Sequence, residues 1–203
     1  MSRTKRVLVL VAIVIVLWLG YRRYSTFPQT YVNTRVGISV NFPSNWRIRL
    51  IERSGMIILN PRLRLFPWNS ATITILSGWE KDPATPTLEE TLRSQVKRLN
   101  SSFFKLEEIH YLRPIEVSEA LGMARTTIRV PTMALPQPGQ MNHMGRRKPD
   151  VFQVIDIYVF ENSPDYYTAV EVDRGRNEST NAQADEIVSS MRFSEPNFDE
   201  PVD

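Results

Sequence analysis

Two kinds of residue in this chain could take part in chemistry: histidines, and arginines that gather in one short stretch. The histidines are His110 and His143. A hydrolytic triad would need one of them beside an activated serine and an acid, but the Gly-x-Ser-x-Gly pattern of a nucleophile elbow does not occur in the sequence. We therefore expect His110 to be an ordinary histidine on a sheet surface, and we expect no catalytic residue.

His143 offers an alternative, because it lies in the stretch QMNHMG between Met141 and Met144. Thioether and imidazole groups suit copper, but the spacing matches no metal motif, so we interpret the stretch as a Met-bearing loop. The chain has no cysteine, which excludes disulfides, thiolate nucleophiles and zinc-thiolate sites. It also has no glycine-rich phosphate loop. The sequence predicts neither a cofactor nor a metal.

The arginines form the most suggestive surface. Between residues 46 and 65 they stand against a single acid, Glu52, and they are Arg47, Arg49, Arg53, Arg62 and Arg64. On a membrane-attached domain, all of these except Arg53 would form a surface for anionic headgroups or for a partner protein, each contributing about 1 kcal/mol near a charged surface. The alternative is that they are the solvated outer face of strands. In that case the partner surface would lie on the loop 131–150.

Length and charge limit the class of protein. The 203 residues suffice for one domain with appendages, and the hydrophobic fraction of 42% provides for a core. Five of the 25 basic residues lie within residues 1–23, which contain no acid, so residues 24–203 carry 20 basic against 22 acidic residues. The excess of positive charge thus lies outside the folded body, and we expect no nucleic-acid partner.

Residues 7–19, VLVLVAIVIVLWL, form an uninterrupted apolar run between two basic clusters. Three interpretations compete: a membrane anchor, a cleaved signal peptide and a buried core helix. Arg22 and Arg23 stand where a cleavage site would need small residues, and a core helix is rarely apolar all round. We favour a single-pass anchor over residues 1–24, with interfacial arginine and aromatic side chains extending a helix that spans only about 22 Å from Val7 to Tyr21, against a hydrocarbon core of about 30 Å.

The orientation of this anchor follows from its flanks. The basic residues on the two sides differ little in number, but the N-terminal tail is very short. We therefore expect a cell-membrane protein with residues 25–203 on the extracytoplasmic side.

The body begins with GISVNFPSNW, residues 37–46, in which apolar and polar residues alternate until Pro43, which cannot donate to a ladder. We expect this stretch to be the first hairpin, with Phe42 and Trp46 in the core, after a linker at 25–36. Residues 37–79 would form an antiparallel meander. Further strands are expected at 105–111, 115–117 and 124–130, and a hairpin at 151–160 and 166–173.

Two amphipathic helices are expected among the strands. Thr87-Leu88-Glu89-Glu90 fits a capping box, and apolar residues follow it at helical spacing, which predicts a helix over 87–100. The second helix spans 177–191, before an acidic tail at 196–203. Because short turns join most strands, the fold class is α+β, with a largely antiparallel sheet flanked by helices.

The chain resembles the PsbP-like superfamily in these elements. The matching residues are Gly37, Phe42, Pro43 and Trp46, the 88–99 helix, the 158–172 hairpin and the closing 187–193 segment. The resemblance covers roughly residues 31–195, and we place the domain at 37–195. It implies an α/β/α sandwich outside the cytoplasm or in a lumen, and its named members are mostly assembly or docking factors without catalytic residues. A photosystem role is not implied, because the anchor and the missing transit peptide depart from the photosynthetic protein.

The sequence thus leads to one expectation and one alternative. We expect a non-catalytic, membrane-anchored docking or assembly domain, whose partners are the membrane and an envelope protein. The alternative is a small-molecule or lipid-binding module that uses the concave face of the sheet.

Overall fold

The computed structural model describes residues 3–25, 27–51, 56–62, 70–80, 87–103, 110–131, 152–163 and 165–197. The helices are α1 (Arg3–Ser25), α2 (Leu88–Phe103) and α3 (Glu178–Ser190). The strands are β1 (Pro28–Asn33), β2 (Ile38–Pro43), β3 (Trp46–Ile51), β4 (Met56–Pro61), β5 (Thr72–Glu80), β6 (His110–Ser118), β7 (Met123–Pro131), β8 (Phe152–Ser163), β9 (Tyr166–Arg174) and β10 (Arg192–Phe193). A single 3-10 turn, Glu119–Leu121, joins β6 to β7.

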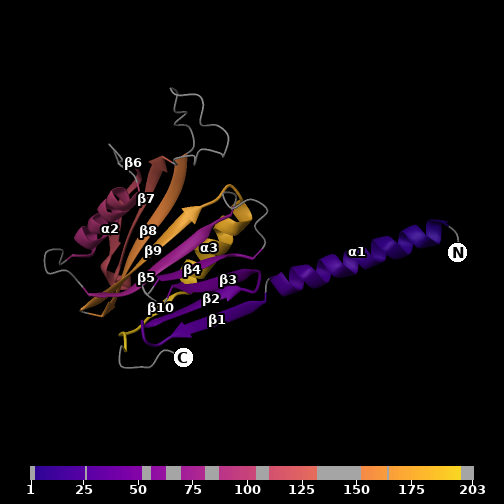
Figure 1. Cartoon of the computed structure of the whole chain (residues 1–203), viewed down its shortest axis with the longest axis horizontal. Helices are drawn as coiled ribbons and strands as arrows, with labels where there is room; N and C mark the ends of the chain where they lie inside the picture. The colour runs from indigo at the N-terminus through magenta and orange to yellow at the C-terminus, as the bar shows by residue number, and fades with distance from the viewer. Residues whose placement is uncertain are drawn as a thin grey trace, which may run out of the picture.

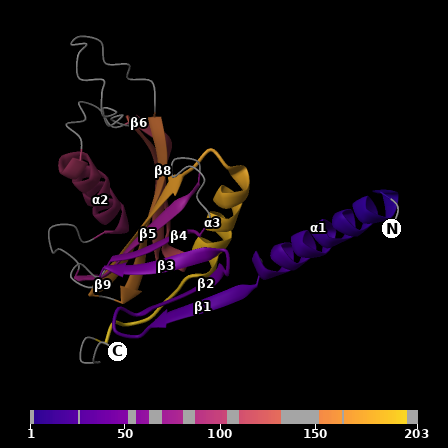
Figure 2. The ribbon, with the colours of Figure 1, turned by 45° about the vertical axis from the view of Figure 1, so that its right-hand side comes forward.

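Most strands belong to one seven-stranded antiparallel sheet, in the order β3-β4-β5-β9-β8-β7-β6. Helix α2 lies on one side of this sheet and α3 on the other (Figures 1 and 2). The prediction of an α+β fold with an antiparallel sheet flanked by helices is confirmed. Residues 105–109 of the strand expected at 105–111, the residues Met141, His143 and Met144, and the tail from residue 198 lie outside the described residues.

Both body helices begin with the caps that their sequences indicate. The backbone N–H of Thr87 donates to Glu90 Oε2 at 3.1 Å, and the N–H of Glu90 donates back to Thr87 Oγ1 at 3.2 Å, so the predicted capping box is confirmed. At α3 the side chain of Asn177 accepts hydrogen bonds from the N–H groups of Ser179 and Thr180.

Two hydrophobic cores hold the layers together. One core lies between α3, the strands β2 and β3, and the middle of the large sheet, and it includes Trp46, which is 0% exposed. The other lies under α2, where Leu92 and Val96 pack against β7, β8 and β9. The two helices therefore cover different halves of the sheet on opposite faces. Each face of the large sheet keeps one half that its helix does not cover.

A second, three-stranded sheet has the order β1-β2-β10, and it corrects two predictions. Strand β2 does not pair with β3, so GISVNFPSNW is not a hairpin: the chain passes from the small sheet to the large one at Ser44 and Asn45. The burial of Phe42 and Trp46 was predicted correctly, because both sheets contribute to the same core. The meander is limited to β3, β4 and β5.

The second correction concerns the expected linker at 25–36, which contains β1. This strand pairs with β2 along its whole length, from Pro28 opposite Pro43 to Asn33 opposite Ile38. Its sequence, PQTYVN, lacks a clear apolar alternation because none of its residues is buried. Backbone pairing with β2 holds this strand, together with Tyr31, which is half-buried and packs against the core.

Gly37 closes the turn between β1 and β2 at a place where another segment crosses. Its φ of +66° lies in the left-handed region, and a Cβ there would lie 2.1 Å from the carbonyl oxygen of Ser194. The N–H of Ser194 donates to the carbonyl of Gly37 at 2.9 Å, directly after β10. This glycine lets the segment after β10 lie against the turn.

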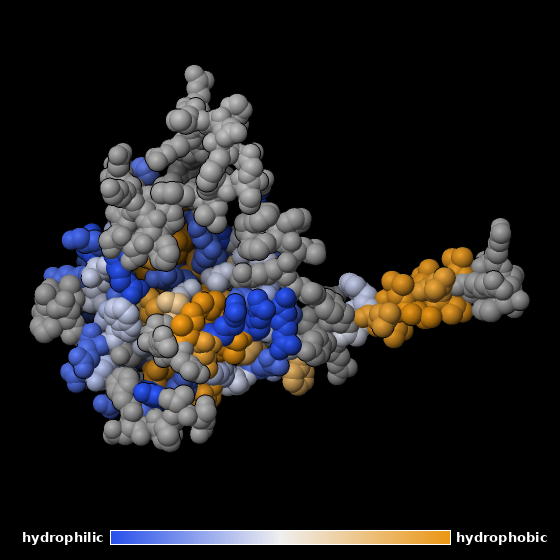
Figure 3. Space-filling view, viewed as in Figure 1, coloured by the Kyte–Doolittle hydropathy of each residue, from blue (hydrophilic) through white to orange (hydrophobic). Residues whose placement is uncertain are grey.

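Helix α1 extends away from the body, and Figure 3 shows that its described surface is hydrophobic along most of its length. It is longer than the apolar run alone and includes 23 residues. Among the described residues, no helix combines the length and mean hydropathy usual for a membrane span.

Candidate functional site

The arginines singled out in the sequence fall at one edge of the large sheet. Arg47 and Arg49 are exposed on β3, on the face opposite Trp46 and Ile48, which belong to the core. Arg62 follows β4 directly and is also exposed, whereas Arg64 lies outside the described residues. Burial and exposure therefore alternate from Trp46 to Arg49, but the alternation ends at Leu50, which is 51% exposed. Whether these arginines bind anything stays a prediction.

Hydrogen bonds place two of these arginines close to the end of α1. The N–H of Ser44 donates to the carbonyl of Phe27 at 2.8 Å, and the N–H of Arg62 donates to the carbonyl of Asn45 at 2.6 Å. Phe27 is two residues beyond the last residue of α1, a separation of at most about 7 Å. The start of β3, the end of β4 and the exit of α1 thus form one end of the domain.

The guanidinium groups of Arg47 and Arg62 are both held by a hydrogen bond from Nε. Arg47 Nε donates to Asn60 Oδ1 at 2.8 Å, and Arg62 Nε donates to the carbonyl of Trp46 at 3.1 Å. Within the described part of the chain, neither group forms a salt bridge with a carboxylate. These bonds orient the two charges without neutralising them.

A second candidate site is a groove on the α3 side of the sheet, over the half that α3 leaves uncovered. Its volume is about 1070 Å³, and β6, β7, β8, α3 and β10 line it. Three aromatic rings form one wall: Tyr158 and Phe160 stack with centroids 6.0 Å apart, and Phe160 and Phe193 stack at 4.6 Å. An open groove with an aromatic wall has the chemical character of a ligand site.

Charged groups on the groove are balanced. Four arginines and four carboxylates line it. Arg125 NH2 lies 2.5 Å from Glu116 Oε2, and the hydrogen bond that Arg125 donates to Glu116 raises the pKa of Arg125. Burial raises the pKa of the Tyr158 hydroxyl, which therefore stays protonated at neutral pH. The groove carries no net charge, so it suits an uncharged molecule with polar and apolar parts.

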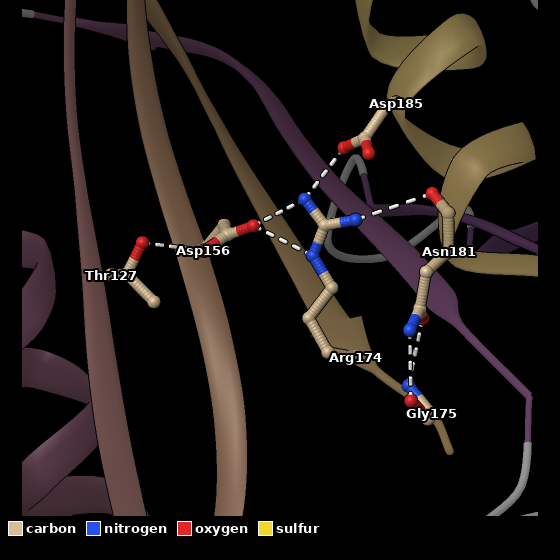
Figure 4. A network of polar contacts seen from close by, with 6 residues as sticks. All are labelled: Thr127, Asp156, Arg174, Gly175, Asn181 and Asp185. Atoms are coloured by element: carbon tan, nitrogen blue, oxygen red, sulfur yellow. Dashed lines mark hydrogen bonds and ion pairs between the residues drawn. The ribbon is translucent and has the colours of Figure 1, made fainter. Parts of the chain in front are cut away.

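One ion-pair network fixes α3 beside this groove (Figure 4). Arg174, at the end of β9, binds Asp156 of β8 and lies 2.6 Å from Asp185 of α3. Its NH1 also donates to the carbonyl of Asn181 at 3.2 Å. Burial alone would lower the pKa of Arg174, but the hydrogen bonds with Asp185 and Asp156 outweigh it and raise that pKa. Arg174 is therefore charged at all physiological pH values and joins two strands to the helix.

Another buried charge lies on the opposite face of the sheet. Burial raises the pKa of Glu171, although Arg98 lies 3.6 Å from its carboxylate. The guanidinium of Arg98 also lies over the ring of Trp79, 4.6 Å from its centroid. This cluster contributes to the packing of α2 against the sheet.

Sequence reasoning did not find the groove. The signal that could have indicated it is β8, VIDIYVF, in which apolar residues occupy both faces of the strand. Ile157 and Val159 belong to the core under α2, whereas Tyr158 and Phe160 face the α3 side. A strand that is apolar on both faces is expected to have other elements packed on both faces of the sheet. Only two helices were predicted in the body to provide that packing.

The structure describes one of the two histidines considered in the sequence, His110. His110 is exposed at the start of β6, as predicted. No three His, Asp or Glu side chains among the described residues converge as metal ligands.

Comparisons with known proteins concern the fold. No known protein family model matches the chain, and no well-characterised protein is significantly similar to it in sequence. Among solved structures, the Saccharomyces cerevisiae Ran-binding protein Mog1p matches with a TM-score of 0.52 and 13% identity, over 83% of this chain and 96% of Mog1p.

Two further structures match less well. LpqN, a Mycobacterium tuberculosis protein involved in cell envelope biogenesis, has 11% identity and a TM-score of 0.46, over 83% of this chain and 91% of LpqN. A Bacteroides thetaiotaomicron protein has 9% identity and a TM-score of 0.44 over 82% of this chain, which spans about half of that protein (48%). The likeness to Mog1p concerns the fold alone, and it agrees with the resemblance seen in the sequence. The chain has a Mog1p/PsbP-like fold.

Proposed function

We propose that this protein is a single-pass membrane protein in which α1 crosses the cell membrane and the domain acts outside the cytoplasm. In this proposal the domain works without catalysis, by docking an envelope protein. The observation that carries the proposal is the surface of α1. Its large apolar side chains at position 7 and at 9–19 are 47–67% exposed, and no polar side interrupts them between residues 9 and 19.

The geometry of α1 supports an anchor better than a helix packed on the domain. Successive residues of a helix point about 100° apart, so residues 13–19 present apolar side chains in every direction. A helix that packed on a domain would bury one side and leave the other polar. The 23 residues span about 34 Å at 1.5 Å per residue, but the apolar run 7–19 covers only about 20 Å of this length. Because the hydrocarbon core is about 30 Å thick, the proposed span requires the basic ends of α1 to reach the headgroup layers.

The extracytoplasmic orientation is supported by the basic residues that flank the apolar run 7–19. Three of them precede the run and two follow it closely, and the side with more basic residues tends to stay in the cytoplasm. Docking rather than chemistry is supported by the two half-faces of the sheet that α2 and α3 do not cover.

The anchor can be tested by placing charge in the middle of α1. The full chain is expected to stay with membranes in high salt and in alkaline carbonate. Val11→Arg with Ile15→Arg should move it to the soluble fraction, because each arginine near the centre of a span costs about 2.5–3.5 kcal/mol.

Val11→Leu with Ile15→Leu is the matched control and should fractionate like the parent. External protease should digest the domain in intact spheroplasts if it lies outside the cytoplasm. Recovery of a soluble chain that begins after residue 24, or full extraction of the parent by salt, would contradict the proposal.

The groove favours a second candidate function, the binding of an uncharged, water-soluble molecule with an aromatic or polyhydroxylated body. The stacked rings offer an apolar face, and the balanced charges offer donors and acceptors without net charge. A fluorescent aryl glycoside is a suitable probe, measured by fluorescence polarisation with the full chain in nanodiscs.

Leu112→Glu should weaken this binding by about tenfold or more, because Leu112 lines the groove and is 50% exposed. Leu50→Glu is a close control, since Leu50 is 51% exposed but lies on β3 at the other edge of the sheet. Equal binding by both variants and the parent would exclude the groove as the site.

A further inference from the structure

We propose that the end of the domain nearest α1, formed by Phe27, Arg47 and Arg62, binds the phosphates of anionic lipid headgroups and thereby fixes the orientation of the domain on the membrane. This inference rests on the proposed function, because it needs α1 in the bilayer. We call this end the rim. The proposed ligand of this arginine surface is the anionic lipid that surrounds the anchor.

The position of the rim beside the exit of α1 favours contact with lipid headgroups. If α1 crosses the bilayer, the residues that follow Ser25 enter the headgroup layer, which adds about 5–7 Å to each side of the hydrocarbon core. Phe27 is 65% exposed in this zone, and its carbonyl binds the turn that leads to β3. Because Arg62 binds Asn45 of the same turn, it cannot lie far from the headgroups.

The guanidinium groups of Arg47 and Arg62 are held in an orientation that suits a phosphate. Each uses Nε to bind the protein, so the terminal nitrogens form the outward end of a fork whose direction is fixed. A guanidinium fork matches two oxygens of one phosphate, and a pre-oriented fork loses little freedom on binding. Without a carboxylate partner among the described residues, neither arginine has to give up an ion pair to bind a phosphate.

A lipid surface suits the rim better than a soluble anion does. Two exposed arginines on the outer edge of a sheet form no enclosed site, and the groove lies on the opposite face of the sheet. Weak individual contacts suffice when α1 keeps the arginines beside many headgroups, because the tether makes the second contact intramolecular. Attraction to an anionic leaflet acts within a Debye length, about 8 Å at physiological salt.

Arg49 has a smaller part in this arrangement. It lies two residues farther along β3, about 7 Å from Arg47 in the direction that leads away from the turn. Among the described arginines of the predicted surface, Arg47 and Arg62 lie closest to the exit of α1, and these two form the rim together with Phe27.

The test measures the orientation of the full chain in vesicles by energy transfer. The chain contains no cysteine, so Ala120→Cys introduces a unique site for a donor dye in the exposed turn between β6 and β7. This turn lies at the opposite edge of the sheet from β3, roughly 25 Å away at about 4.8 Å per strand. The acceptor is a headgroup-labelled lipid, in vesicles of phosphatidylcholine alone or mixed with phosphatidylglycerol.

We expect the transfer efficiency to differ between the two lipid mixtures, and the difference to disappear in high salt. Arg47→Glu with Arg62→Glu should abolish the difference while the protein still floats with both vesicles. Lys97→Glu with Arg113→Glu changes the net charge by the same amount, but on α2 and β6, away from the rim. This control should preserve the difference in transfer efficiency between the two lipid mixtures. If the glutamate variant unfolds at a lower temperature than the parent, Arg47→Gln with Arg62→Gln removes the two positive charges without introducing negative ones and gives the same comparison.

Each contrary outcome has a distinct meaning. Equal transfer on both lipids, or loss of the difference in the α2 and β6 control, overturns the rim and leaves the anchor in place. Displacement by inorganic phosphate beyond the effect of chloride at equal ionic strength shows a soluble-anion site and also overturns it. A parent chain that floats with neither vesicle refutes the anchor and the rim together.

Discussion

Replacing Trp46 by alanine is expected to lower the free energy of unfolding by about 3–5 kcal/mol. The side chain is 0% exposed, and it packs where β3, β4 and α3 meet. Its Nε1 donates to Gln183 Oε1 at 2.8 Å, so the substitution leaves a large cavity and leaves Gln183 Oε1 with only the longer bond from Asn45 Nδ2, at 3.4 Å. Denaturant unfolding of the full chain in detergent measures this change.

Trp46→Phe separates the two contributions. Phenylalanine keeps most of the apolar volume but loses the hydrogen bond to Gln183, so we expect a loss of about 1–2 kcal/mol. A change below about 1 kcal/mol in the alanine variant, with an unaltered denaturant slope, would mean that the ring is not part of the core.

Replacing Arg174 by methionine should cost about 2–4 kcal/mol, the second largest effect. Methionine preserves the aliphatic stem but leaves Asp156, whose side chain is 14% exposed, without its cation. Arg174 itself is 18% exposed, so the cost should be somewhat smaller than for a fully buried pair. The contact between α3 and β8 should weaken most, because Arg174 joins them through Asp156 and Asp185.

A double variant distinguishes the stranded charge from lost packing. Asp156→Asn with Arg174→Met removes both charges and keeps an acceptor for Thr127 Oγ1, which donates to Asp156 at 2.7 Å. We expect it to be more stable than Arg174→Met alone. Asp185→Asn should cost less than about 1 kcal/mol, since that carboxylate is 56% exposed. If the double variant is no better than the single one, the ion pair is not the source of the loss.

Local signals in the sequence predicted most of the elements correctly. The capping box at Thr87 and Glu90 places the start of α2, and alternation from Trp46 places β3. Strands β1 and β10 could not be recognised, because each contributes only one large side chain to the core, Tyr31 and Phe193, and is otherwise held by backbone pairing with β2. Pairing between segments about 150 residues apart leaves no periodic trace in the sequence.

The candidate sites show the same limit. Alternation along β3 correctly placed Arg47 and Arg49 on the outer face, since period-two patterns depend only on the strand itself. That Arg62 lies beside the exit of α1 depends on bonds through Ser44 and Asn45, which join three separate segments. The groove depends on which half of the sheet α3 leaves open, and that is decided by the network around Arg174.

The position of β10 beside β2 has a consequence for the order in which the chain folds during synthesis. Strand β2 pairs early with β1, but its other side stays an unpaired edge until residues 192–193 have been made. Exposed strand edges are templates for association with other chains, and late, distant pairings form slowly. The nascent domain thus carries an open edge for most of its translation, next to the segment that leads to α1. A ribosome that stalls before residue 192 would release a chain prone to strand-to-strand aggregation.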